Sequence, residues 1–349
     1  MKSNTAVLAL LTLGAFSVHA ATFTAAMDND YKTPGNWSGG VVPNTAGGDT
    51  AQINNGSAVT YNPGGDFAIG NGGTLQITNG SWTQITSGAW IQLGQGAGNG
   101  HILVDGGTFN QGTAGNNPFN VNGTGNTFTV TSGAANFSSS VQARSGVAWS
   151  LSGGTTTMTV GNLEVQSGGV FSVSGGSLNI AGGVILQDGS SWSQTGGTVT
   201  LGAGSEFDYN SLTGCFMSGG VLNVPKLLTG VNGPVGSSFD FSGGVINDGG
   251  SVFNGWYGAD NANHPFNFTL GSTGVINFLN SATTISQVTG WLAAGGIQYN
   301  DTIAPSAFSV TQPGGTGTTV ILQVIPEPSS LAAFLVGATG LLILRRRRA

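Results

Sequence analysis

The stretch GGVFSVSGGSLNI at residues 168–180 contains two copies of one phrase, Gly-Gly-x-Φ-x-Φ, in which Φ is an apolar residue. Each copy is typical of a glycine turn followed by a short strand in which apolar and polar residues alternate. The phrase recurs at Gly72, Gly196 and Gly219. We expect the apolar positions of the five copies to point the same way, toward a core: Leu75, Ile77, Phe171, Val173, Leu178, Ile180, Val199, Leu201, Leu222 and Val224.

The spacing of the glycines indicates how these strands assemble. The second glycines of successive phrases, Gly154, Gly176, Gly197, Gly220 and Gly244, are separated by 22, 21, 23 and 24 residues. A repeat of about 22 residues that holds up to three short strands is typical of one coil of a parallel β-helix, in which each strand stacks on its equivalent in the next coil. Glycine at the corners supplies the positive φ that sharp turns need.

The sequence therefore predicts an all-β protein whose body, residues 61–285, is a right-handed parallel β-helix of about ten coils. At about 4.8 Å per coil, the rod would be about 50 Å long. Residues 21–60 contain no full phrase and are expected to cap the first coil. Residues 251–269 interrupt the spacing and are expected to form a loop at one corner, and residues 286–322 to form a C-terminal cap or linker.

Composition favours this fold over disorder. The chain has 62 glycines and only 6% charged residues, yet 39% of its residues are hydrophobic, which is enough apolar material for a long core. The single cysteine, Cys215, cannot form an internal disulfide, so stability must come from packing and backbone pairing. We interpret Cys215 as a buried small residue rather than a reactive thiol.

The first 20 residues have the features of a secretory signal peptide: one lysine, an apolar stretch and small residues before Ala21. We expect cleavage between Ala20 and Ala21; an uncleaved anchor is the alternative. The exported chain without its last five residues would carry three cations against fourteen acidic residues, a net charge of −11. This balance argues against binding to nucleic acid or to anionic lipid headgroups.

The C-terminal segment, residues 323–349, differs in character from the rest of the chain. An apolar run, Leu331–Leu344, is followed by four arginines. As a helix counted from Ser329 it would span about 24 Å, against about 30 Å for a bilayer core, and is a marginal membrane span. The arginines would remain in the cytoplasm and stop transfer through the inner membrane: Arg345, Arg346, Arg347 and Arg348.

Pro326, Glu327 and Pro328, followed by a small polar pair, the apolar run and the terminal arginines, resemble the PEP-CTERM sorting signal of Gram-negative bacteria. The resemblance implies recognition and processing by an exosortase in the membrane, and a location at the cell surface or in an extracellular polysaccharide. A simple C-terminal anchor would explain the helix and the arginines but not Pro-Glu-Pro. The repeats, and the segment at residues 36–43, are more loosely similar to secreted β-helix and autotransporter-passenger proteins.

Residues suited to catalysis are sparse. The chain has no serine-hydrolase elbow, no His-Glu-x-x-His and no cysteine pair, so we expect no metal and no cofactor. A β-helical polysaccharide lyase or hydrolase would use Glu206 and Asp208, which alternate onto one side of a strand, or Asp260 with His264. Three cations are too few for a site that binds acidic sugars.

Two other polar positions have simple structural interpretations. His101 is expected to cap a turn or the start of a strand. The Asp28-Asn29-Asp30 segment lacks the pattern of a calcium loop and is expected to form a turn near the cap.

The sequence favours a non-enzymatic exported protein with a structural or adhesive role at the cell surface or in a biofilm matrix. Its expected partners are an exosortase-type enzyme and extracellular polysaccharide or the cell surface. One alternative is a glycan-binding module that uses Trp256 and Tyr257 of the expected loop. The remaining tryptophans considered for glycan contact are expected mainly in the solenoid or at its ends: Trp82, Trp90, Trp149, Trp192 and Trp291. A lyase or hydrolase is the less favoured alternative.

Overall fold

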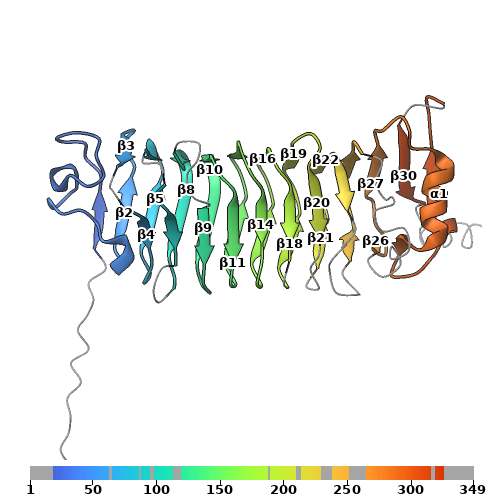
Figure 1. Cartoon of the computed structure of the whole chain (residues 1–349), viewed down its shortest axis with the longest axis horizontal. Coiled ribbons are helices and arrows are strands. Elements are labelled where there is room, and N and C mark those ends of the chain that lie inside the picture. Colours follow the sequence, from blue (N-terminus) through green and yellow to red (C-terminus); the bar gives the residue numbers. More distant parts are fainter. Residues whose placement is uncertain are drawn as a thin grey trace, which may run out of the picture.

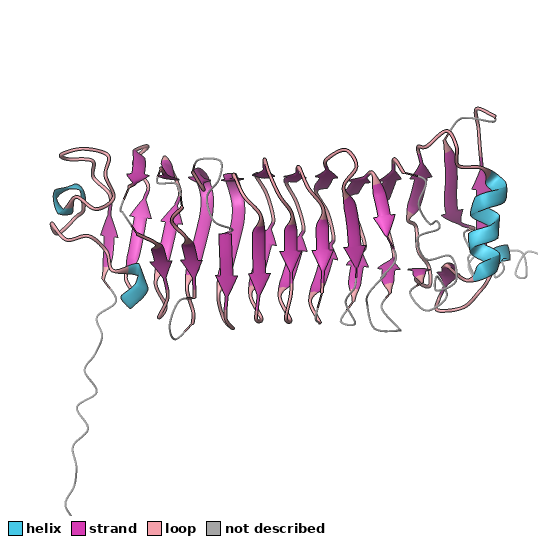
Figure 2. Cartoon of the chain, in the orientation of Figure 1, coloured by secondary structure: helices cyan, strands magenta, loops and turns pink. Residues whose placement is uncertain are grey.

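The computed structural model describes residues 19–62, 65–85, 88–94, 98–112, 119–187, 189–209, 214–228, 238–250, 265–315 and 319–325. They form an elongated solenoid in which the chain winds from one end of the body to the other (Figures 1 and 2). Each complete turn contributes one strand to each of three parallel ladders, so equivalent residues of successive turns lie side by side.

The first ladder begins at the N-terminal end of the body and includes the first half of the two long strands β8 and β10. Its strands are β1 (Ala20–Thr22), β2 (Thr50–Ile53), β5 (Thr74–Ile77), β8 (His101–Asn110), β10 (Thr127–Phe137), β12 (Ala148–Leu151), β15 (Val170–Val173), β18 (Ser191–Gln194), β21 (Cys215–Met217), β24 (Phe239–Phe241), β26 (Phe266–Phe268) and β28 (Ile297–Tyr299).

The second ladder includes the other halves of β8 and β10, because both strands continue through the corner between the two ladders. Its remaining parallel strands are β3 (Ala58–Tyr61), β6 (Ser81–Gln84), β13 (Thr155–Met158), β16 (Ser177–Ile180), β19 (Thr198–Leu201), β22 (Val221–Val224), β25 (Val245–Asp248) and β27 (Val275–Phe278). An antiparallel pair, β30 (Val320–Val324) and β29 (Phe308–Thr311), closes this ladder by pairing β30 with β27.

The third ladder is an eight-stranded sheet of its own. Its strands are β4 (Phe67–Ile69), β7 (Ile91–Leu93), β9 (Phe119–Asn122), β11 (Val141–Arg144), β14 (Leu163–Val165), β17 (Val184–Leu186), β20 (Glu206–Tyr209) and β23 (Lys226–Leu228). The solenoid thus has about eight complete turns, fewer than the ten coils expected. The difference arises because β24–β25 and β26–β27 extend the first and second ladders without a described strand on the third.

The alternation read from the sequence separates the core from the surface. Most of the four-residue strands show the pattern half-buried, buried, half-buried, buried. All ten apolar positions expected to point inward are buried, each at most 6% exposed, which confirms that prediction. The five phrases nevertheless supply two different ladders: those at Gly72 and Gly168 form β5 and β15, and the other three form β16, β19 and β22.

An aromatic column runs through the core. Trp82 stacks on Phe109 with ring centroids 5.1 Å apart, and Phe171 stacks on Trp192 at the same separation, with interplanar angles of 6° and 7°. Other ring contacts link these pairs to each other and continue to Phe308 at the C-terminal end. Each such ring contributes stacking of about 0.5–1.5 kcal/mol beyond its burial.

The two ends of the solenoid are covered differently. At the N-terminal end, the short helices η1 (Pro34–Asn36) and η2 (Thr45–Gly47) flank a cluster in which Trp37 makes edge contacts with Phe23 and Tyr31. The strands β2 and β3 lie in the segment expected to form the cap, so the stack of coils begins before residue 61.

At the C-terminal end lie the helix α1 (Ile285–Ala294), η3 (Pro305–Ala307) and the β29–β30 pair (Figure 1). The side chain of Thr284 accepts a hydrogen bond from the Gln287 N–H, and Gln287 bonds back to Thr284, which fixes the start of α1. No helix among the described residues is long and apolar enough to cross a membrane. The apolar run Leu331–Leu344 lies outside these residues.

One expected loop is in part a strand. Residues 266–268 fall in the segment 251–269 that was expected to leave the solenoid, but they form β26 and pair with β24 and β28. Phe266 and Phe268 keep the apolar alternation although no Gly-Gly precedes them, and both side chains are buried. The middle residue, Asn267, is bonded to Asp240 and Asp301 at 3.0 and 2.8 Å. The rest of the expected loop, residues 251–264, is not described.

The corner glycines stack on one another from turn to turn. Gly197 has φ +67°, and a Cβ atom placed there would lie 2.7 Å from the carbonyl oxygen of Gly175 in the preceding turn. Gly204 has a similar φ of +78°, but no atom lies within 4 Å of the position of its Cβ. The repeat therefore needs glycine at Gly197 for two reasons, the left-handed backbone and the close approach of two coils.

These two glycines form a matched test of coil spacing. Gly204→Ala should cost about 1–2 kcal/mol of unfolding free energy, from backbone strain alone. Gly197→Ala should cost clearly more, because the added methyl group also separates two turns. Urea unfolding of both variants measures the difference, and equal losses would show that the turns do not press together at Gly197.

The inward row at the end of the second ladder contains a carboxyl group. Asp248 is buried between Val224 and Phe278 of the adjacent strands, where it accepts a hydrogen bond from Gly250 N–H at 2.9 Å through Oδ1. Its Oδ2 has no hydrogen-bond partner in the part of the chain that the structure describes. Burial raises the pKa of Asp248 from 3.8 to about 7, because a charged carboxylate is poorly solvated there.

Between about pH 4 and pH 7, Asp248 is therefore protonated in the folded protein, whereas the same carboxyl group is ionised in the unfolded chain. Stability should fall as the pH rises from about 4 to about 7, by up to about 4 kcal/mol. Asp248→Asn should abolish this loss and be more stable than the parent protein at pH 8, as measured by thermal unfolding at pH 5 and pH 8. Ile180→Val, in the same row but three strands away from Asp248, should lower stability equally at both pH values; a pH-independent parent protein would contradict the assignment.

Candidate functional site

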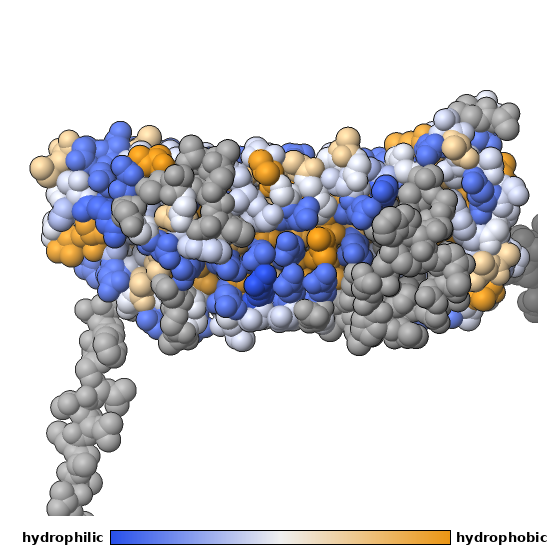
Figure 3. Space-filling view, viewed as in Figure 1, coloured by the Kyte–Doolittle hydropathy of each residue, from blue (hydrophilic) through white to orange (hydrophobic). Residues whose placement is uncertain are grey.

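The outer surface of each ladder is the candidate functional surface, because every strand places alternate side chains in solvent. The described strands contain two cationic residues and two glutamates, and all four lie on the third ladder: Arg144, Glu164, Glu206 and Lys226. Hydrophilic side chains gather in the middle of the face that carries β9, β11 and β14 (Figure 3). Asp208 lies on the same ladder, whereas Asp105, Asp240 and Asp248 lie on strands of the other two, so the third ladder holds five of the eight Asp, Glu, Lys and Arg residues of the described strands.

The two carboxylates considered for the less favoured lyase or hydrolase alternative lie on this charged face. Glu206 and Asp208 do point to the same side of β20, as expected, and both are partly exposed. Glu206 is in register with Lys226 of the next turn, and Oε1 lies 3.0 Å from Nζ. Because both side chains are more than 40% exposed, the ion pair is well solvated and contributes about 0–1 kcal/mol. This arrangement pairs one carboxylate with a cation across two coils.

The other glutamate of this face, Glu164, is held by amides. Glu164 Oε2 accepts hydrogen bonds from Gln142 Nε2 at 3.0 Å and from Gln166 Nε2 at 3.2 Å. Gln142 and Glu164 are neighbours in the ladder register. Two of these contacts, Glu206–Lys226 and Gln142–Glu164, join neighbouring turns along the solenoid axis. They can stabilise the stacking of the strands, and the same side chains can form hydrogen bonds with polar ligands.

The second ladder presents a different surface that the sequence interpretation did not single out. One outward position is threonine or asparagine on every parallel strand from β3 to β27: Thr60, Thr83, Asn110, Asn136, Thr157, Asn179, Thr200, Asn223, Asn247 and Asn277. We call this set the Thr/Asn row. The neighbouring outward position holds only alanine, serine, threonine or valine. This face carries no charge at either position over its full length.

Hydrogen bonds between turns run along the Thr/Asn row. Asn136 Nδ2 donates to Asn110 Oδ1 at 2.8 Å, and Asn110 Nδ2 donates to Thr83 Oγ1 at 3.0 Å. Asn277 and Asn247 are joined in the same way at 2.9 Å. The sequence signal for this row is the fifth position of the repeated phrase, which is Asn or Thr in the three copies that build the second ladder.

Three of the polar residues considered in the sequence are hydrogen-bonded locally or buried: His101, Asp28 and Cys215. His101 is the first residue of β8, and its Nδ1 lies 2.9 Å from Thr127 Oγ1. Asp28 accepts hydrogen bonds from Asp30 N–H at 2.8 Å and from Thr33 Oγ1 at 3.1 Å. The Asp30 N–H is the main reason that the pKa of Asp28 is lowered. Cys215 is buried, and burial raises the pKa of its thiol.

Most of the described tryptophans that were considered for glycan contact are buried in the core of the solenoid. Trp82, Trp149 and Trp192 are fully buried in the aromatic column, as the sequence interpretation favoured. Trp90 is only partly buried, and Trp291 packs against Phe278 at the C-terminal end with ring centroids 5.5 Å apart. The candidates for glycan contact in the expected loop, Trp256 and Tyr257, lie outside the described residues, as do Asp260 and His264.

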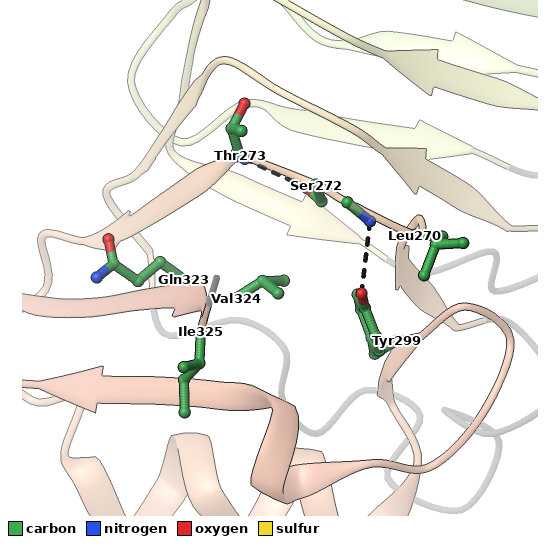
Figure 4. A pocket seen from close by; sticks show the side chains of 9 residues that line it. Leu270, Ser272, Thr273, Tyr299, Gln323, Val324 and Ile325 are labelled. Atoms are coloured by element: carbon green, nitrogen blue, oxygen red, sulfur yellow. Dashed lines mark hydrogen bonds between the residues drawn. The ribbon is translucent and has the colours of Figure 1, made fainter. Parts of the chain in front are cut away.

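A cavity of about 460 Å³ lies at the C-terminal end, between the β26–β27 connection and the end of β30 (Figure 4). Leu270 and Ile325 are exposed beside it, and Tyr299 Oη accepts a hydrogen bond from Gly271 N–H at 3.4 Å. Among the described residues that line the cavity there is no carboxylate, imidazole or amine, and the phenol of Tyr299 is their one titratable side chain. The described chain ends at Ile325, directly before the predicted sorting motif.

The sorting residues and most of the signal segment lie outside the described residues. Pro326, Glu327 and Pro328 and the terminal arginines, Arg345 to Arg348, lie outside the described residues, and so does the chain before His19. Ala20 and Ala21 belong to β1, and Ala21 is buried opposite Ala51 of β2. No group of histidine, cysteine, aspartate and glutamate within the described segments is arranged to hold a metal ion.

No family model, curated protein or solved structure matches the chain. Its function is therefore inferred from its residues and their geometry alone.

Proposed function

We propose that the protein is a non-enzymatic, exported rod with a structural or adhesive role at the surface of a Gram-negative bacterium or in its extracellular polysaccharide. The main support is the body itself, a continuous stack of turns. The outer surface of its second ladder presents the Thr/Asn row and has no charged residue at either outward position over ten strands. Such a surface suits extended contact with a polymer or a matrix. Glu206, one of the carboxylates considered for catalysis, is paired with Lys226 of the next turn, which supports a structural role for it.

The proposed route to this location rests on the two ends of the sequence. A signal peptide directs export, and cleavage between Ala20 and Ala21 would leave Ala21 and Thr22 to pair with β2. Pro326, Glu327 and Pro328 then serve as the recognition motif of an exosortase-type enzyme, while the apolar run and the arginines hold the chain in the inner membrane. Right-handed winding of the body is part of this proposal, since parallel crossovers almost always have that hand.

The experiment is intact-mass analysis of the protein from its native host after separation of inner membrane, outer surface and medium. We expect a species that begins at Ala21, lacks the residues after about Pro326 and is found in the surface or extracellular fraction. Replacing Pro326, Glu327 and Pro328 with alanine should leave the full tail attached and the protein in the inner membrane. Ser329→Ala with Ser330→Ala is the matched control and should be processed normally; a full-length membrane protein in every case would contradict the proposal.

A further inference from the structure

A groove crosses the coils at the corner between the second and third ladders. It has a volume of about 450 Å³ and follows β6, β8 and β10 over successive turns. This volume falls within the range of small-molecule sites, about 300–1,000 Å³. Thr83, Asn110 and Asn136 of the Thr/Asn row form one side of it.

The amides along this side have hydrogen-bonding capacity left for a ligand. An asparagine side chain offers two donors and two acceptor lone pairs. The bond to Asn110 uses one donor of Asn136, and Asn110 uses one donor and one lone pair in its bonds along the row. Both side chains are only half-buried. Donors and acceptors therefore repeat at the strand spacing of about 4.8 Å.

The groove also has an apolar part. Ile85 follows directly after β6 and is 45% exposed, although it is a large aliphatic residue. It lines the groove, whereas the ring of Phe137, another lining residue, is buried in the aromatic core. Apolar walls with a few placed polar groups are the usual lining of ligand sites. A sugar matches this combination, because each ring has C–H faces and a rim of hydroxyl groups.

A buried amide beside the groove lacks one hydrogen bond. Gln84 is fully buried and lines the groove; its Nε2 donates to Ala89 O at 2.9 Å. Its Oε1 has no partner in the described parts of the chain. A buried acceptor without a donor is unfavourable, but because the Gln84 side chain is fully buried, this oxygen lies behind the surface of the groove, and the half-buried amides of Asn110 and Asn136 are the groups that a ligand can reach.

The charge of the groove selects among polysaccharides. Among the described residues that line it, none is lysine, arginine, aspartate or glutamate, and the whole chain has a net charge of −6. An acidic polymer would find no cation in the groove and a negative protein around it. We propose that this groove binds a segment of a neutral polysaccharide, whose repeating hydroxyls bond to Asn110 and Asn136 while a sugar ring rests on Ile85. This inference names a partner for the proposed matrix protein and rests on that function only for the presence of polysaccharide.

Affinity gel electrophoresis of the full chain tests the site. The gels contain dextran, a glucomannan, a galactan or, as the acidic probe, alginate. We expect retardation by at least one neutral polymer and none by alginate. Asn110→Ala with Asn136→Ala should weaken the retarding affinity about tenfold or more, since two hydrogen bonds to the ligand are lost. Ile85→Lys, at an exposed position that folding tolerates, should abolish retardation.

The chain supplies a matched control on the same row. Asn247→Ala with Asn277→Ala removes the same kind of hydrogen-bonded pair, away from the groove, and should leave retardation within twofold of the parent protein. Thermal unfolding of both double variants shows whether they lose the same stability. Equal weakening by both pairs, or no retardation by any neutral polymer, would overturn the assignment. If sedimentation instead shows a dimer that Ile85→Lys disrupts, the groove binds a second copy of the chain and the proposal is wrong.

The native fractionation experiment is independent of these gels. A protein found in the matrix but not retarded by any neutral polymer would refute this site while leaving the proposed function intact. If the protein stays in the inner membrane of its host but is retarded by a neutral polymer, the site is supported and the proposed function is refuted.

Discussion

Parallel pairing of each strand with its equivalent in the next turn, in register, is the constraint on which the rest of the structure depends. In-register pairing places the same position of every turn in one row along the axis, so a choice of residue is repeated about every 4.8 Å. Inward rows become aromatic and aliphatic stacks, as in Phe171 on Trp192. Outward rows become ladders of like polar groups, and the corner row requires glycine at Gly197 because the adjacent backbone leaves no room for a side chain.

This organisation explains how a chain with 6% charged residues and no disulfide among its described residues forms a long, ordered body. Each added turn buries its own apolar residues against the preceding one, so stability accumulates from neighbour contacts. The end of the second ladder and one of its inward rows depart from this parallel stacking of apolar residues. The antiparallel β30 covers the last parallel strand of the second ladder and so protects an edge that could otherwise pair with another chain. Asp248 breaks an apolar row one strand before that end.

The sequence was sufficient for the repeat, the all-β class and the buried positions, because these follow from alternation and glycine spacing within about 22 residues. It could not assign a phrase to a face: the phrase at Gly168 and the phrase at Gly175 look alike, yet they build β15 and β16 on different ladders. The number of complete turns also depends on whether each turn supplies a third strand, which no local pattern states. The aromatic column was missed although Trp149, Phe171 and Trp192 follow one another at the spacing of the repeat. Phe171 was expected to point inward and Trp149 and Trp192 to lie mainly in the solenoid or at its ends, but each was considered singly rather than as part of one row.

The division between inside and outside also determines where function can reside. Inward residues are fixed by stacking, whereas an outward row can change chemistry without disturbing the fold, provided that its members suit their neighbours along the axis. The third ladder places glutamate, arginine and lysine in such rows, and the second ladder over the same turns has only threonine and asparagine in the corresponding row. Both kinds of row pair in register from turn to turn, so the fold accepts either chemistry on its outer surface. The uncharged face of the second ladder borders the groove that we propose as a site for a neutral polysaccharide.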